Sequence, residues 1–102
     1  MALDGWAWRI RHYIGAYAAL LGGVDGIVFT GGIGENSALA RSLSVSGLEF
    51  MGISLDSYLN ERKSQEARTI SPHGATVRVM VIPTNEELEI ARQTHLLITQ
   101  AR

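Results

Sequence analysis

The sequence of 102 residues contains no cysteine and only two prolines. The absence of cysteine excludes a disulfide framework and any metal site built from thiolates. An excess of charge of one sign is also lacking, since nine basic residues nearly balance ten acidic ones and the formal net charge is −1. A chain balanced in this way lacks the electrostatic footprint of a nucleic-acid-binding protein. We therefore expect neither a nucleic-acid partner nor a basic membrane-binding surface.

Long hydrophobic runs are missing as well. The longest apolar stretch, residues 14–24, is too short to span a bilayer. The N-terminus lacks the basic start and uninterrupted apolar core of a secretory signal. Hydrophobic residues nevertheless make up 46% of the chain, which is ample for a packed core. The expectation is a soluble, cytoplasmic, folded domain with no membrane contact.

The apolar pattern predicts an alternation of helices and strands. Residues 3–21 carry apolar side chains at helical spacing, with Gly22 and Gly23 as a stop signal. Residues 24–30 are apolar without alternation, which predicts a strand buried on both faces, and residues 77–82 predict a second strand. The remaining expected elements are a helix over 37–44, a helix over 55–65 with Leu55, Tyr58 and Leu59 facing inward, a short edge strand over 67–71, and a last helix from residue 84 through residue 98.

This order implies an α/β fold with a parallel pair of strands. We treat residues 1–102 as a single structural unit, because no linker, repeat or low-complexity segment divides them. A parallel pair is normally buried inside a wider sheet with helices on both sides. The chain therefore resembles the end of a larger domain, whose missing strands come from sequence or a partner not present here. Exposed strand edges would favour association with another chain.

The most informative segment is residues 28–37, VFTGGIGENS. A β-branched and aromatic run stops at glycines, which let backbone N–H groups approach a ligand closely. A helix beginning near Asn36 or Ser37 would direct the positive end of its dipole to the same place. These features together predict a cradle for a nucleotide or a phosphate. The alternative is a strand-to-helix turn that needs glycine only for its geometry.

Two better-known phosphate motifs do not fit this segment. A dinucleotide fingerprint would have glycine where Ser37 stands, and the acidic residue about twenty positions on, Asp56, falls at a predicted helix start rather than at a strand end. A phosphate loop is excluded because no lysine follows the glycines.

A second constellation follows the second strand, in residues 81–87, VIPTNEE. Glu86 and Glu87 occupy a predicted helix start just past the carboxyl end of a strand, the edge at which open α/β sheets bind ligands. One of them could hold Mg²⁺ through oxygen ligation against the phosphates of a nucleotide. The alternative is that both carboxylates only stabilise the helix N-terminus. If the two strands are parallel, the glycine segment and this acidic segment lie at the same edge, and that coincidence favours a binding site.

Other polar and aromatic residues carry weaker signals. The histidines share no ligand spacing and are treated as non-catalytic: His12, His73 and His95. Arg9 and Arg11 are expected as surface charges. The aromatic residues are expected to pack rather than to stack on bases, because no basic patch accompanies them: Trp6, Trp8, Tyr13 and Tyr17.

Three segments together resemble the C-terminal end of acetate kinases. They are YIGAY at residues 13–17, IVFTGGIGENS at residues 27–37 and VIPTNEEL at residues 81–88. Their order and spacing also resemble that family, so the resemblance covers essentially the whole chain and is weakest over residues 56–76. Propionate kinases share the same signatures, so the acyl substrate stays open.

The resemblance implies the fold of an actin-like (ribonuclease H-like) ATPase domain, with α/β/α layers and a short parallel sheet, incomplete relative to the family. It implies the reversible transfer of the γ-phosphoryl group of ATP to acetate, giving ADP and acetyl phosphate. It also implies that the nucleotide site includes Gly32, Ile33, Gly34, Glu35 and Asn36. Glu86 would be the residue associated with Mg²⁺, and Glu87 a structural neighbour. Family enzymes are commonly homodimers through this region.

The residues that such enzymes use to bind the carboxylate and to stabilise the transferring phosphoryl group lie in sequence that is absent here. We therefore expect no catalytic residue within this chain and no acetate kinase activity from it alone. A non-catalytic module that binds a nucleotide or docks a partner is the alternative.

Overall fold

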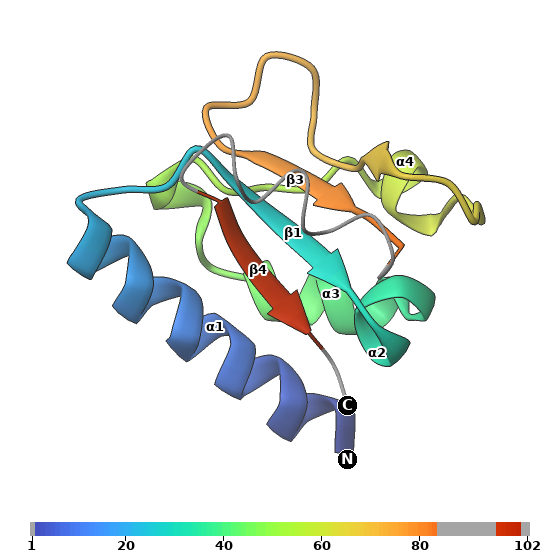
Figure 1. The fold of residues 1–102 in the computed structure, drawn as a ribbon, viewed down its shortest axis with the longest axis horizontal. Helices are drawn as coiled ribbons and strands as arrows, with labels where there is room; N and C mark the ends of the chain where they lie inside the picture. The colour runs from blue at the N-terminus through green and yellow to red at the C-terminus, as the bar shows by residue number, and fades with distance from the viewer. Residues whose placement is uncertain (1, 84–95, 101–102) are drawn as a thin grey trace.

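The structure, a computed structural model, describes residues 2–83 and residues 96–100 (Figure 1). Its helices are α1 (Ala2–Leu21), α2 (Gly32–Asn36), α3 (Ala38–Val45), the 3-10 helix η1 (Glu49–Met51) and α4 (Ser57–Glu61). Its strands are β1 (Gly26–Thr30), β2 (Arg68–Thr69), β3 (Arg78–Val81) and β4 (Leu96–Gln100). The predicted mixed α/β class is confirmed.

The four strands form one sheet in the order β2-β3-β1-β4. Strand β1 pairs in parallel with β3, where Phe29 lies opposite Val81, and also in parallel with β4. Strand β2 is antiparallel to β3 and lies at an edge, as the sequence predicts for residues 67–71. The predicted parallel pairing of the two apolar strands is therefore confirmed, and it brings their carboxyl ends to one edge of the sheet.

The prediction of a helix that continues through residue 98 is wrong, because residues 96–100 form β4. The leucine and isoleucine residues in this stretch fit helical spacing, but Ile98 and Thr99 are β-branched and also suit a strand. Pairing with the open edge of β1, from Gly26 opposite Leu96 to Thr30 opposite Gln100, satisfies backbone groups on both strands. The first part of the predicted helix, residues 84–95, lies outside the described residues.

Helices α1 and α3 lie together on one face of the sheet (Figure 1). That face contributes alternate strand residues, among them Phe29 and Val81, to the core, and Ile14 of α1 and Ala40 of α3 pack into the same cluster. Burying these side chains is the main source of stability for such a layer, at about 25 cal/mol for each Å² of apolar surface removed from water. The second helical layer of the expected α/β/α arrangement stays a prediction, because the helix predicted from residue 84 falls on residues outside the described ones.

The long first helix matches its prediction, and Gly22 and Gly23 end it with positive φ angles of 76° and 128°. None of the described helices is both long enough and apolar enough to cross a bilayer. The predicted helix over residues 55–65 is much shorter, because α4 starts after the cap residue Asp56 and stops at Glu61. Residues 62–66 are all polar, so continuing the helix would bury no further apolar side chain.

Tyr58, expected to face inward, is exposed instead, and so is Phe50. Tyr58 of α4 is 75% exposed, whereas its neighbours Leu55 and Leu59 pack against the core. Phe50 of the 3-10 helix is 84% exposed, although Leu48 in the same connector is buried. In both places the chain buries one side of a short helical turn and leaves the other side in contact with solvent.

Candidate functional site

The glycine-rich segment after β1 is a short helix rather than the bare turn that the sequence predicts. Gly31 adopts a φ of 78° and a ψ of 171°, a backbone conformation that residues with a Cβ rarely adopt. It redirects the chain at the end of β1, and Gly32 to Asn36 then form α2. Glycine is therefore required for backbone conformation at Gly31, which precedes the segment predicted to line the site.

Two side chains of α2 form hydrogen bonds back to the beginning of the helix. The N–H of Gly31 donates to Oε2 of Glu35 at 2.7 Å, and the N–H of Glu35 donates to the carbonyl oxygen of Gly31 at 2.8 Å. The side-chain amide of Asn36 donates to the carbonyl oxygen of Gly32 at 2.9 Å. The carboxylate of Glu35 thus holds the entry to α2, a structural contact that the sequence reasoning missed.

The five predicted nucleotide-site residues differ in exposure. Gly32 and Asn36 are exposed, and Ile33 and Glu35 are half-buried. Gly34 is buried, and a Cβ added there would lie 3.6 Å from the backbone of Phe29. That distance is an ordinary van der Waals contact, so α2 lies against the end of β1 with room for a Cβ at Gly34.

The carboxyl ends of β1 and β3 meet beside α2, as the parallel arrangement predicts. The N–H of Ile82 donates to the carbonyl oxygen of Phe29 at 3.0 Å. A cavity of about 310 Å³ is lined by Glu35 and Asn36 of α2 together with Val81, Pro83 and Arg68. The glycine segment and the start of the acidic segment are therefore adjacent. Glu86 and Glu87 lie outside the described residues, so their predicted place at this edge stays a prediction.

Arg41 of α3 is a buried cation beside this edge that the sequence reasoning did not single out. Its exposed fraction is 2%. Its Nη1 donates to the carbonyl oxygens of Gly34 and Glu35 at 3.0 and 3.1 Å. Burial lowers the pKa of Arg41 to about 10, and the charge of Arg68 adds to that effect. The guanidinium keeps its charge at neutral pH.

Arg68 of β2 lines the cavity of about 310 Å³ beside α2. Its Nη1 donates to the carbonyl oxygen of Ser64 at 3.1 Å, while its buried Nε has no hydrogen-bond partner within the described part of the chain. Burial lowers the pKa of Arg68, and the nearby charge of Arg62 is the second cause. A second cavity of about 370 Å³ is lined by all three arginines and by Glu35 and Asn36. The environment beside α2 is therefore rich in guanidinium groups.

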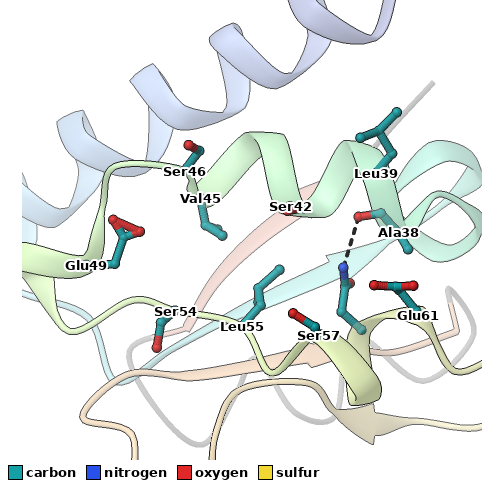
Figure 2. A pocket seen from close by; sticks show the side chains of 11 residues that line it. Ala38, Leu39, Ser42, Val45, Ser46, Glu49, Ser54, Leu55, Ser57 and Glu61 are labelled. Carbon is teal, nitrogen blue, oxygen red and sulfur yellow. Dashed lines mark hydrogen bonds between the residues drawn. The ribbon is translucent and has the colours of Figure 1, made fainter.

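A larger cavity of about 610 Å³ lies elsewhere, between α3 and α4 (Figure 2). Its charged lining residues are the acids Glu49 and Glu61, and its other polar groups include the hydroxyls of four serines. Acidic and hydroxyl groups without a cation do not complement a polyphosphate. The cavity of about 370 Å³ beside α2 fits an anionic ligand better, because four of its lining residues are arginine or lysine.

Within residues 2–83, no group of three or more histidine, aspartate or glutamate side chains could hold a metal ion. His12, predicted to have no catalytic role, is exposed and stacks on Trp8 with ring centroids 5.2 Å apart. His73 is also exposed, in the turn before β3. His95 lies outside the described residues.

A sequence profile of the acetokinase family matches residues 1–92. The chain belongs to the acetokinase family. It is 62% identical over 93 residues to an acetate kinase of Clavibacter michiganensis, covering 91% of this chain and 24% of that protein. It is 50% identical over 101 residues to an acetate kinase of Streptomyces coelicolor, covering 99% of this chain and 25% of that protein.

Solved structures of the family share the fold described above. The crystal structure of Porphyromonas gingivalis acetate kinase matches with a TM-score of 0.77 and 46% identity, covering 91% of this acetokinase chain and 23% of that chain. A propionate kinase from Francisella tularensis matches with a TM-score of 0.69 and 34% identity, over 91% and 23% of the two chains. This acetokinase sequence spans about a quarter of the length of the relatives it matches.

Proposed function

We propose that this chain is the nucleotide-binding C-terminal segment of an acetate kinase, which transfers the γ-phosphoryl group of ATP reversibly to acetate. The observation that carries this proposal is the placement of α2 at the carboxyl edge of β1, next to the end of β3, in a chain of the acetokinase family. The proposed nucleotide-binding residues are those of the glycine-rich segment: Gly32, Ile33, Gly34, Glu35 and Asn36.

The role of Glu35 within that set is refined by its contacts. Its carboxylate accepts a hydrogen bond from Gly31 at 2.7 Å, so we assign it to shaping the segment. Asn36 is exposed at the carboxyl end of α2 and offers an amide group to a polar ligand. Exposed Gly32 lets the ligand approach the backbone.

Mg²⁺ is the proposed metal cofactor, and Glu86 its protein ligand. A carboxylate oxygen is a ligand type that Mg²⁺ prefers, and this ion usually keeps several waters and binds substrate phosphates as well. The support from the described residues is that β3 ends at Val81 beside α2, five residues before Glu86. When bound, Mg²⁺ would neutralise charge on the transferring phosphoryl group.

No residue of this chain is proposed as catalytic. Phosphoryl transfer depends on positioning and on charge stabilisation from several directions. The carboxylate-binding part would come from kinase sequence outside these residues, with which this segment would associate in the cytoplasm. A homo-oligomer of this chain is the other association that we propose. Propionate is the alternative acyl substrate, since a propionate kinase is among the structural matches. A non-catalytic nucleotide-binding or protein-interaction role is the alternative from another class.

Enzyme assay of the purified chain tests this proposal. We expect no ADP release from ATP, Mg²⁺ and acetate with the 102-residue protein alone, and formation of acetyl phosphate after the remaining kinase portion is added. Propionate in place of acetate distinguishes the two acyl substrates. Turnover by the chain alone would contradict the expected inactivity. A complex with the remaining portion that forms but shows no turnover would favour the non-catalytic alternative.

A further inference from the structure

Arg41 connects the glycine-rich helix α2 to α4 through one buried guanidinium. On one side, Nη1 donates to the carbonyl oxygens of Gly34 and Glu35 at 3.0 and 3.1 Å. On the other side, Nε donates to Oδ1 of Asn60 at 2.8 Å, and Nη2 donates to the carbonyl oxygen of Asn60 at 2.7 Å. All four acceptors are uncharged amide or carbonyl oxygens. These contacts therefore fix geometry and do not form an ion pair.

The position of α2 depends on such contacts. A helix of five residues is far too short to be stable by itself in water, because the cost of nucleation is not recovered. Its last carbonyl groups have no donors within the helix, and those of Gly34 and Glu35 are the ones that Arg41 binds. Arg41 thus supplies donors at the carboxyl end of α2, whereas Glu35 braces its beginning.

The partner of Arg41 is held in place as well. Asn60 is 5% exposed, and its side-chain amide donates to the carbonyl oxygen of Ala38 at 3.0 Å, the bond drawn in Figure 2. Arg41 and Asn60 therefore tie α2, α3 and α4 together around fixed amide groups. The planar fork of arginine is suited to several simultaneous hydrogen bonds, which a lysine ammonium cannot reproduce at the same reach.

We propose that Arg41, held by Asn60, is a positioning residue for nucleotide binding: it sets the place of α2 and so of the exposed groups of Gly32 and Asn36. Arg41 itself is buried behind α2 and acts through that helix. This inference rests on the proposed function, because it takes the ligand that binds beside α2 to be a nucleotide.

The first test is amide hydrogen exchange of Arg41→Lys, with Arg9→Lys as the control that makes the same change on the exposed side of α1. The amides of Glu35 and Ser37 bond to Gly31 and Ile33 within α2. We expect these two amides to exchange about tenfold faster or more in Arg41→Lys, with β1 amides unchanged, which is local opening rather than global unfolding. An equal acceleration throughout β1 would show a general stability role and overturn the proposal, as would unchanged exchange at Glu35 and Ser37.

The second test is titration with Mg²⁺ and ATP. We expect the dissociation constant for ATP to rise about tenfold in Arg41→Lys, the size of a typical coupling between sites, and to stay the same in Arg9→Lys. Asn60→Asp keeps an acceptor for Nε of Arg41 but loses the N–H donated to Ala38, so it is expected to lose less affinity than Asn60→Ala, which removes both groups. Asn60→Ala also keeps the inference testable if Arg41→Lys folds poorly. Unchanged affinity in both Arg41→Lys and Asn60→Ala would overturn the inference.

A wrong proposed function would give a different experimental result from a wrong role for Arg41. If the unaltered chain binds no ATP, the proposed nucleotide site is wrong and the nucleotide part of this inference falls with it. The exchange rates at Glu35 and Ser37 then still decide whether Arg41 holds α2 in place.

Discussion

Gly52 follows the 3-10 helix and combines an unusual backbone conformation with a close neighbour. Its φ is 82°, and a Cβ added there would lie 2.9 Å from the Cβ of Thr76. We expect Gly52→Ala to lower the free energy of unfolding by about 1–2 kcal/mol from the left-handed backbone alone, with a further loss from displacing Thr76. Chemical denaturation monitored by circular dichroism measures this change.

Gly15 provides the matched control for the substitution at Gly52. It lies inside α1, has no positive φ, and nothing is within 4 Å of the position where a Cβ would be. Gly15→Ala is expected to raise the free energy of unfolding by up to about 1 kcal/mol, because alanine has the higher helix propensity. Equal effects of the two substitutions would show that the φ of Gly52 and the contact with Thr76 do not matter.

Single residues also mark the limit of prediction from sequence. The glycine-rich segment itself is recognisable, because glycines directly after an apolar strand are uncommon and chemically suggestive. Arg41 is not, because its partner Asn60 is nineteen positions away and reaches it only when α3 and α4 have packed. The sequence contains only a weak indication that Arg41 is buried: it follows Ala40 on the apolar side of a short amphipathic helix.

At the scale of secondary structure, Ser37 separates α2 from α3. Its hydroxyl oxygen accepts a hydrogen bond from the N–H of Ala40 at 3.1 Å, which is the geometry of an N-cap. We expect Ser37→Ala to lower the free energy of unfolding by about 1 kcal/mol, because one N–H in the first turn of α3 loses its partner. Thermal or urea unfolding tests this expectation.

Aspartate is a comparably good N-cap residue, so Ser37→Asp is the conservative comparison for Ser37→Ala. We expect Ser37→Asp to keep stability close to that of the unaltered chain. If the aspartate variant is destabilised as much as the alanine variant, the hydroxyl of Ser37 contributes through packing rather than through capping.

The elements differ in how well the sequence predicts them. The strands β1 and β3 are predicted within two residues, since short apolar runs rich in β-branched residues favour a strand. β4 is missed, because its leucines and isoleucine satisfy a helical period and only pairing with β1 selects the extended form. Helix α2 is missed for a related reason: glycine has low helix propensity, and the brace from Glu35 to Gly31 is not visible as periodicity.

For the molecule as a whole, the outer surface of α1 carries several large apolar side chains. The exposed fractions are 57% for Trp8, 44% for Tyr13 and 80% for Leu20. Large exposed apolar side chains favour association with another chain. We predict that the purified protein sediments above the monomer mass and that Leu20→Ser lowers the associated fraction while leaving the circular dichroism spectrum unchanged.

Exposed Tyr58 on α4 serves as the control for association through α1. Tyr58→Ser removes a comparable exposed apolar group from a different helix. The prediction requires that Tyr58→Ser leave the sedimentation behaviour unchanged. A monodisperse monomer for the unaltered chain, or equal effects of the two substitutions, would contradict association through α1.

The order of strands in the sheet also bears on how fast the chain reaches its native state. β1 is synthesised early, yet its two neighbours are β3, some fifty residues later, and β4, later still. Forming the centre of the sheet therefore means closing long loops before the pairing energy is gained, and topologies of that kind fold slowly. Helix α1 can form locally at once, so the rate-limiting event should be the docking of β3 against β1.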